Sequence, residues 1–132
     1  MIHQVRIIFG DTDQMGVVYY ANYLRFFEAS RAAYWRGLGR THKDIDDWGV
    51  ALPVVEAHCR YRKPAFYEDL LDVQVEITEV RGASLRFEYL VCRDGELLAE
   101  GFTRHAVIDR NGRPRALPDA LRSAIVPAPP AR

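Results

Sequence analysis

One stretch decides the fold, and it reads Asn22-Tyr23-Leu24-Arg25-Phe26-Phe27-Glu28-Ala29-Ser30-Arg31-Ala32-Ala33-Tyr34-Trp35-Arg36-Gly37. It is rich in helix formers and free of proline, so it predicts one long helix that ends near Gly37 and Gly39. A set of its residues is spaced to line one face: Tyr23, Phe26, Phe27, Ser30, Ala33 and Tyr34. Aromatic residues also lie on other sides, which favours deep coverage of this helix by a sheet.

Alternating patterns flank the helix on both sides. Residues 2–9 alternate loosely and are rich in β-branched residues, as a strand is. After Pro53 the period changes to two, and four further strands are predicted at Leu52–Tyr61, Leu70–Arg81, Ser84–Cys92 and Leu97–Ile108. Short connectors at 81–83 and 93–96 predict hairpins. With short helices near 43–48 and 118–125, this order predicts an α+β fold with one antiparallel sheet and a helix against one face.

Length and composition limit the class of protein. The 132 residues suit one domain, expected at 1–125, followed by a proline-rich tail at 126–132. Eighteen basic and eighteen acidic residues balance to zero, so no global field would attract nucleic acid. No apolar run is long enough to span a bilayer and no secretory signal is seen at the start, so we expect a cytoplasmic protein. Cys59 and Cys92 are predicted to be buried thiols.

Two carboxylates lie in the loop that joins the first strand to the long helix. Asp11 and Asp13 stand between Gly10 and Gly16, just before a helix N-terminus whose unpaired N–H groups suit a developing oxyanion. A nearby carboxylate can attack a carbonyl or activate a water. These residues alone leave two alternatives open, namely that both aspartates are caps or turn residues, or that they are weak metal ligands.

The run from Asp11 to Glu28 closely resembles the opening motif of the 4-hydroxybenzoyl-CoA thioesterase and Tol-Pal-associated acyl-CoA thioesterase family. A weaker similarity continues through Tyr61–Leu70 and Val107–Asp109, so it reaches about Pro118. The resemblance implies a single hotdog domain, with an antiparallel sheet wrapped around one long central helix. It further implies a homodimer as the minimum unit, with a homotetramer expected, active sites between subunits, and no metal or other cofactor.

The resemblance also implies roles for residues of the loop. Asp13 would be the catalytic aspartate, acting as nucleophile or general base, and Asp11 would be structural. The backbone N–H of Tyr20 would polarise the thioester carbonyl, while Gly16 and Val17 would contact the substrate. Some Tol-Pal-associated members have a histidine at the position of Tyr20, and a tyrosine hydroxyl cannot replace it near neutral pH.

Three residues further along are assigned to substrate binding. Glu28 would hold an acyl hydroxyl from the long helix, with pairing to a neighbouring arginine as the alternative. Arg81 and Arg115 stand where family members place phosphate-binding side chains. Alternatives for the phosphates of CoA are Arg60, Arg62 and Lys63, and surface charge is the alternative for all five.

The sequence therefore predicts an acyl-CoA thioesterase acting on a short-chain or aromatic acyl group. A hotdog hydratase or dehydratase would need an acid/base pair near the helix start that usually includes histidine, but no histidine lies between His3 and His42. A non-catalytic acyl-CoA-binding protein on the same fold is the second rival, since a fold does not fix a function.

Overall fold

The chain forms one antiparallel sheet with helices on one side. The structure is a computed structural model that describes residues 1–125, so the predicted tail at 126–132 lies outside the described residues. In chain order the elements are β1 (Ile2–Arg6), η1 (Phe9–Asp11), α1 (Asn22–Gly37), α2 (His42–Asp47), β2 (Val54–Tyr61), β3 (Leu70–Arg81), β4 (Ser84–Arg93), β5 (Glu96–Ala106) and α3 (Asp119–Ala124).

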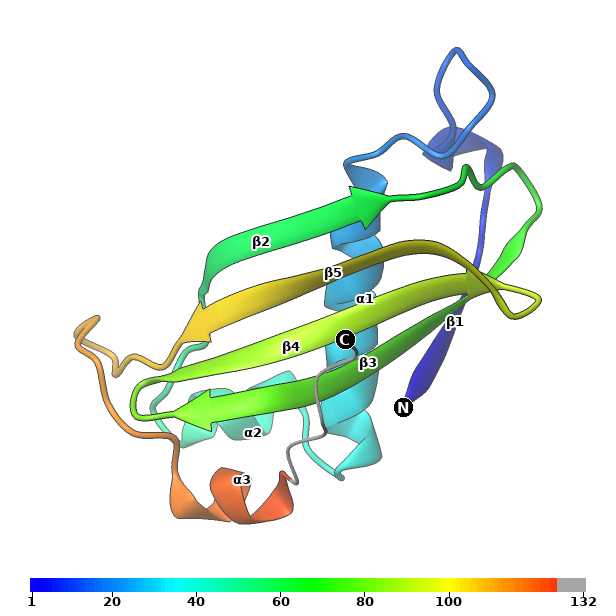
Figure 1. Ribbon diagram of the computed structural model, residues 1–132. Coiled ribbons are helices and arrows are strands. Elements are labelled where there is room, and N and C mark those ends of the chain that lie inside the picture. The colour runs from blue at the N-terminus through cyan, green and yellow to red at the C-terminus, as the bar shows by residue number, and fades with distance from the viewer. Residues whose placement is uncertain (126–132) are drawn as a thin grey trace.

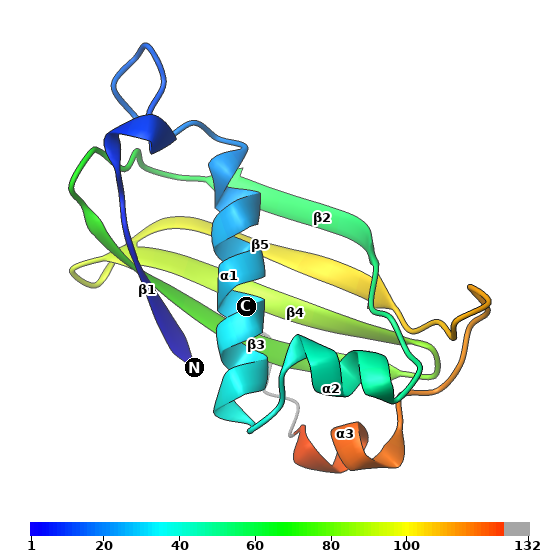
Figure 2. The same ribbon diagram turned by 180° about the vertical axis from the view of Figure 1, so that it is seen from behind.

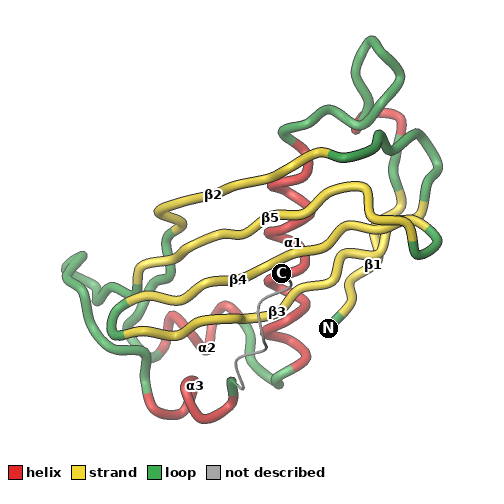
Figure 3. Tube along the Cα trace, viewed as in Figure 1, coloured by secondary structure: helices red, strands yellow, loops and turns green. Residues whose placement is uncertain are grey.

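The five strands lie in the order β1-β3-β4-β5-β2, and every neighbouring pair is antiparallel (Figures 1 and 3). The hairpins β3-β4 and β4-β5 form the predicted meander. β1 and β2 are the two edges, so each has one side without a strand partner in residues 1–125. The β2 and β5 strands pair from Val54 opposite His105 to Tyr61 opposite Ala99.

Helix α1 runs across one face of the sheet, and α2 lies on the same side (Figure 2). Its inward face buries Tyr23, Phe26, Phe27, Ser30, Tyr34 and Trp35. The Phe27 ring stacks on Tyr89 of β4 with 4.1 Å between centroids. A Cβ at Gly101 of β5 would overlap the His58 carbonyl oxygen and lie 3.0 Å from the Phe27 ring, so this glycine allows α1 to approach the sheet closely.

Most predicted elements are confirmed within two residues of their ends, and the α+β class is confirmed. The first strand stops at Arg6, three residues early, because the chain then turns through η1. Ala33 is half-buried rather than buried. Cys59 and Cys92 are free thiols, as predicted, but they are half-buried rather than buried.

Candidate active site

The loop before α1 is a tight hairpin held at both ends. The Asp13 N–H donates to the Val17 carbonyl (2.9 Å) and the Gly16 N–H donates to the Asp13 carbonyl (3.0 Å). Gly16 has φ +79°, a left-handed conformation that glycine adopts without strain. The Val18 N–H donates to the carbonyl of Ala65 (2.9 Å), which fastens the hairpin to the segment before β3.

One of the two carboxylate oxygens of Asp13 is engaged in a hydrogen bond, and the other is not. Its Oδ1 accepts a 2.8 Å hydrogen bond from the Met15 N–H, which fixes the side chain over the turn. Its Oδ2 has no hydrogen-bond or ion-pair partner in the described part of the chain. A fixed carboxylate with one unengaged oxygen is what a nucleophile or a general base needs.

Asp11 differs from Asp13 in every contact. It is only 6% exposed, its Oδ2 accepts from the Ile8 N–H (3.0 Å), and its Oδ1 lies 3.4 Å from the Arg25 guanidinium. Its carbonyl oxygen accepts from the Tyr19 N–H and the Asn22 side-chain amide, both at 2.9 Å. Asp11 therefore ties η1 to the start of α1, and its carboxylate is occupied.

The start of α1 presents two unpaired donors. Neither the N–H of Tyr20 nor that of Ala21 has an acceptor among residues 1–125. The Tyr20 carbonyl accepts from the Tyr61 hydroxyl (2.9 Å) and from the Tyr23 N–H (3.3 Å), which orients the peptide that carries the Ala21 N–H. Desolvation of the hydroxyl raises the pKa of Tyr61, so this group stays protonated and able to donate.

Asp13, Tyr20 and Tyr61 line one pocket of about 300 Å³, here called the Asp13 groove. Its walls come from the hairpin, the start of α1, and residues 61–64. Two cations of its rim are already paired, since Arg62 Nε lies 2.7 Å from Glu100 and Lys63 Nζ lies 2.6 Å from Glu96. Polar groups able to hold and attack a carbonyl therefore meet in one small groove.

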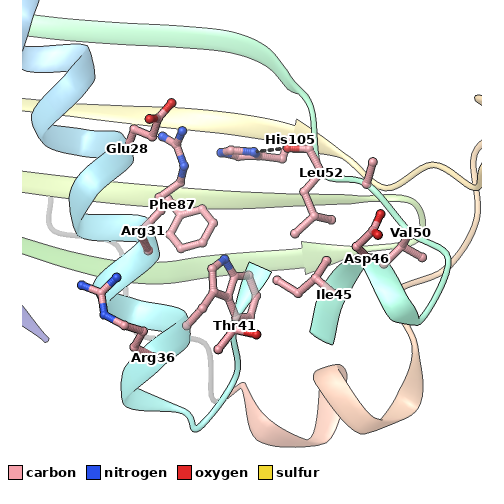
Figure 4. Close-up of a pocket in the computed structure, with 13 residues that line it drawn as sticks. Glu28, Arg31, Arg36, Thr41, Ile45, Asp46, Val50, Leu52, Phe87 and His105 are labelled. Carbon is pink, nitrogen blue, oxygen red and sulfur yellow. Dashed lines mark hydrogen bonds between the residues drawn. The ribbon is translucent and has the colours of Figure 1, made fainter. Parts of the chain in front are cut away.

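A larger pocket of about 590 Å³, here called the α1–α2 pocket, lies further along α1 (Figure 4). Glu28, Arg31 and Trp35 line it from α1, while Phe87 and His105 line it from the sheet. The predicted substrate residue Glu28 thus faces this pocket and is not among the residues that line the Asp13 groove. Among the described residues, no ion pair joins Glu28 to a neighbouring arginine.

A chain of hydrogen bonds runs under the α1–α2 pocket. Arg31 donates to the Tyr89 hydroxyl (3.1 Å), which lies 2.6 Å from Thr103 Oγ1. That oxygen lies 2.8 Å from Nε2 of His105, whose Nδ1 lies 2.8 Å from the Leu52 carbonyl (Figure 4). The carbonyl can only accept, so Nδ1 carries the proton. Each hydroxyl in the chain then donates toward His105.

The surroundings of this hydrogen-bond path also favour the neutral form of His105. Burial lowers the pKa of His105, and the nearby Arg31 cation adds to this effect. A neutral His105 can accept from Thr103 at Nε2 while donating from Nδ1. The two hydroxyls and both ring nitrogens of His105 along this buried path are therefore matched with partners.

The structure brings together only some of the predicted site residues. Asp13, Val17 and Tyr20 line the Asp13 groove, and Gly16 shapes its hairpin without lining it. Arg81 and Arg115 lie at the other end of the sheet. Arg81 closes β3 with Nε 3.5 Å from Glu79, and the Arg115 N–H donates to Val107 just beyond β5.

Sequence reasoning missed two features. Tyr61 was quoted only as part of a similar segment, and nothing in its residue type signals a bond to the Tyr20 carbonyl. His105 lies in the predicted strand Leu97–Ile108, and the sequence predicted no role for its side chain. Its signal was available in the alternation of β5, where Thr103 and His105 occupy positions of the inward face.

Within residues 1–125, no cluster of three or more histidine, cysteine or acidic side chains is arranged to hold a metal ion. None of the described helices combines the length and the apolar character needed to cross a membrane.

Comparisons with known proteins identify the family of this chain. The model of the Thioesterase-like superfamily matches residues 7–125. The chain belongs to this superfamily. It is 35% identical over 122 residues to the acyl-CoA thioesterase YbgC of Haemophilus influenzae, covering 91% of this chain and 90% of that one. It is 30% identical over 119 residues to the 1,4-dihydroxy-2-naphthoyl-CoA hydrolase of Synechococcus elongatus, covering 88% of each.

A solved gentisyl-coenzyme A thioesterase superposes with a TM-score of 0.87 at 25% identity, covering 96% of this chain and all of that chain. The similarity to these solved and named thioesterases supports the hotdog fold and identifies this chain as a thioester hydrolase.

Proposed function

We propose that this thioesterase hydrolyses an acyl-CoA with a short-chain or aromatic acyl group, using Asp13 as its catalytic carboxylate. The observation that carries the proposal is one groove lined both by Asp13, which has an unengaged carboxylate oxygen, and by Tyr20, whose N–H at the helix start is unengaged. The groove supplies the two things that acyl transfer needs, a base or nucleophile and a donor for the carbonyl oxygen. We place the protein in the cytoplasm.

The reaction can follow either of two balanced routes through the same groups. In the first, Asp13 takes a proton from water, the hydroxide adds to the carbonyl, and the resulting oxyanion accepts from the Tyr20 N–H. The C–S bond then breaks, and the thiolate takes the proton back from Asp13. In the second, Asp13 Oδ2 displaces the thiolate to form a mixed anhydride, which water then hydrolyses.

The acyl group is proposed from the relatives and from the pocket. Both the naphthoyl-CoA hydrolase and the gentisyl-CoA thioesterase act on aromatic acyl groups by their names. The aromatic at Tyr20 is shared with the 4-hydroxybenzoyl branch, whereas some Tol-Pal-associated members have a histidine there. We therefore place the chain nearer the 4-hydroxybenzoyl branch, with Glu28 facing an acyl hydroxyl.

We also propose a homodimer as the working unit, with a homotetramer as a further step. The β2 strand is an unpaired edge whose side chains are mostly exposed, among them Val54 at 45% and Val55 at 60%. An unpaired edge with apolar side chains is a template for another strand. Antiparallel pairing with β2 of a second copy would cover it, and the sheet would then continue around both α1 helices.

The test is hydrolysis of short-chain, long-chain and aromatic acyl-CoAs by the wild-type protein, measured as release of free thiol. We expect turnover of at least one short-chain or aromatic member. Binding of acyl-CoAs without thiol release would replace this proposal with the non-catalytic binding protein. Hydration of an enoyl-CoA without thiol release would replace it with the hydratase.

A further inference from the structure

The loop that joins β1 to α1 is hydrogen-bonded at two places to one short turn, residues 65–69. Where the chain enters the loop, the Ile7 N–H donates to the carbonyl of Asp69 (2.9 Å). Where the chain leaves it, the Val18 N–H donates to the carbonyl of Ala65 (2.9 Å). Ile7, Val18 and Ala65 are buried, so both bonds are shielded from water. The turn therefore sets where the loop lies at the end of the sheet (Figures 1 and 2).

This turn has a backbone that depends on contacts to hold it. Glu68 has φ +73°, a left-handed conformation that residues with a Cβ rarely adopt, and such residues persist where the surrounding structure fixes them. The Asp69 N–H donates to the Phe66 carbonyl (3.1 Å), and Asp69 Oδ2 accepts from the Phe66 N–H (2.8 Å). The carboxylate of Asp69 therefore closes the turn.

Arg93, the last residue of β4, binds this turn at both of its ends. Its Nη1 donates to Asp69 Oδ2 (2.7 Å) and to the carbonyl of Pro64, just before the turn (3.3 Å). Its guanidinium lies 5.8 Å from the centroid of the Phe66 ring. The two paired side chains are only 23% and 21% exposed, and a charge-assisted bond shielded in this way contributes more than one on the open surface. Arg93 therefore fastens the turn to the sheet.

We propose that Asp69 and Arg93 are positioning residues for thioester hydrolysis, because their ion pair holds turn 65–69 and the turn holds the loop that carries Asp13. Neither side chain is among the described residues that line the Asp13 groove, so both act through the backbone of the turn. This inference rests on the proposed function and names residues that set the geometry of the same site. Asp13 Oδ2 and the Tyr20 N–H must meet one carbonyl group, and a displacement of about 1 Å can lower the rate about 100-fold.

Arg86 offers a matched control on the same strand. Its side chain is 26% exposed, its Nε lies 3.1 Å from Glu88, and its guanidinium lies 3.8 Å from the centroid of the Phe102 ring. It thus resembles Arg93 in exposure and in both kinds of contact. Its two neighbours in β4 are buried against α1, so Arg86 lies on the opposite face of the sheet.

The test measures steady-state kinetics of Arg93→Gln and Arg86→Gln on the preferred acyl-CoA. We expect Arg93→Gln to have about a tenfold lower kcat and an unchanged KM, because the reacting groups are displaced while the contacts that bind substrate remain. Arg86→Gln should keep the wild-type kcat although it loses a similar ion pair. Arg93→Lys keeps a cation beside Asp69 and should recover at least about half of the wild-type kcat.

Hydrogen exchange measures how firmly the loop is held, without reference to activity. The Val18 amide should exchange about tenfold faster in Arg93→Gln than in wild type or Arg86→Gln, because its acceptor in the turn is no longer fixed. Asp69→Asn takes the place of Arg93→Gln should that variant not fold. Asparagine keeps an oxygen for the bond within the turn but has no charge for Arg93.

Three kinetic results would overturn the positioning role. These are a wild-type kcat in Arg93→Gln, an equal fall of kcat in Arg86→Gln, and a raised KM at constant kcat, which would assign Arg93 to substrate binding. Failure of the proposed function is distinguished from these results, because the wild-type protein would then release no thiol from any acyl-CoA. Normal thiol release together with unchanged Val18 exchange in Arg93→Gln would overturn the positioning role alone.

Discussion

The polar groups near the two ends of α1 differ in whether they have hydrogen-bond partners. In the Asp13 groove, one carboxylate oxygen of Asp13 and the N–H of Tyr20 have no partner among residues 1–125. The Met15 N–H nevertheless holds the carboxylate, and the Asn22 N–H, which donates to the Tyr19 carbonyl, holds the peptide that carries the Tyr20 N–H. Under the α1–α2 pocket, the polar groups from Arg31 to the Leu52 carbonyl are matched to one another. Chemistry needs groups that are fixed yet unengaged, whereas a binding wall needs groups that are already satisfied.

Apart from replacing Asp13 itself, the largest expected effect comes from distorting the hairpin. Gly16→Val places a β-branched residue at φ +79° and shifts the carboxylate of Asp13, so we expect about a 100-fold lower kcat. Thermal unfolding should change little, because the hairpin is exposed. Gly95→Val is the matched control, since Gly95 has φ +82° in the β4-β5 turn with equally open space around it. Equal activity losses in the two variants would refute a specific role for the hairpin.

At the other end, the expected effect is on stability. Tyr89→Phe leaves the Thr103 hydroxyl without its donor and Arg31 without its acceptor, so the free energy of unfolding should fall by about 2 kcal/mol. Denaturant unfolding measures this. Tyr67→Phe, at a tyrosine that is 52% exposed, should change it by less than about 0.5 kcal/mol. A Tyr89→Phe protein as stable as wild type would mean that the hydrogen bonds of Tyr89 contribute nothing to the free energy of unfolding.

A smaller effect is expected at Tyr61, which positions the helix start. Tyr61→Phe removes the bond to the Tyr20 carbonyl, and the loss of about 1 kcal/mol predicts roughly a fivefold lower kcat. Since the ring is retained in the groove wall, KM should stay the same. Steady-state kinetics on the preferred acyl-CoA separate the two constants. A raised KM with an unchanged kcat would make Tyr61 a binding residue instead.

The smallest effect concerns pH. The pKa of His105 is lowered in the folded protein, so the unfolded chain binds a proton more readily than the native one does. The stability that follows from a neutral His105 is present above the unfolded pKa of 6.5 and is lost as pH falls below it. Thermal unfolding at about pH 8 and about pH 5.5 should show a fall for wild type that is smaller in His105→Gln. Equal falls would exclude His105 as the cause, because His3, whose pKa is also lowered, is present in both.

Local patterns predicted much of the fold and marked the loop before α1 as the candidate site. The inward face of α1 and the meander follow from periods that each segment carries by itself, and the motif resemblance separated Asp13 from Asp11. The bond from Tyr61 to Tyr20 and the path from Arg31 to His105 join residues 41 to 74 positions apart. Such contacts depend on strand register and helix approach, which no local period encodes.

The most direct test of the account is the rate constant of Asp13→Asn with the preferred acyl-CoA, measured alongside its thermal unfolding. Asparagine keeps an oxygen for the Met15 N–H but cannot serve as a strong base or nucleophile. We predict that kcat falls about 1,000-fold while the unfolding midpoint stays at the wild-type value. A variant that keeps more than about half of the wild-type kcat would contradict the central claim, because the groove would then act without its carboxylate.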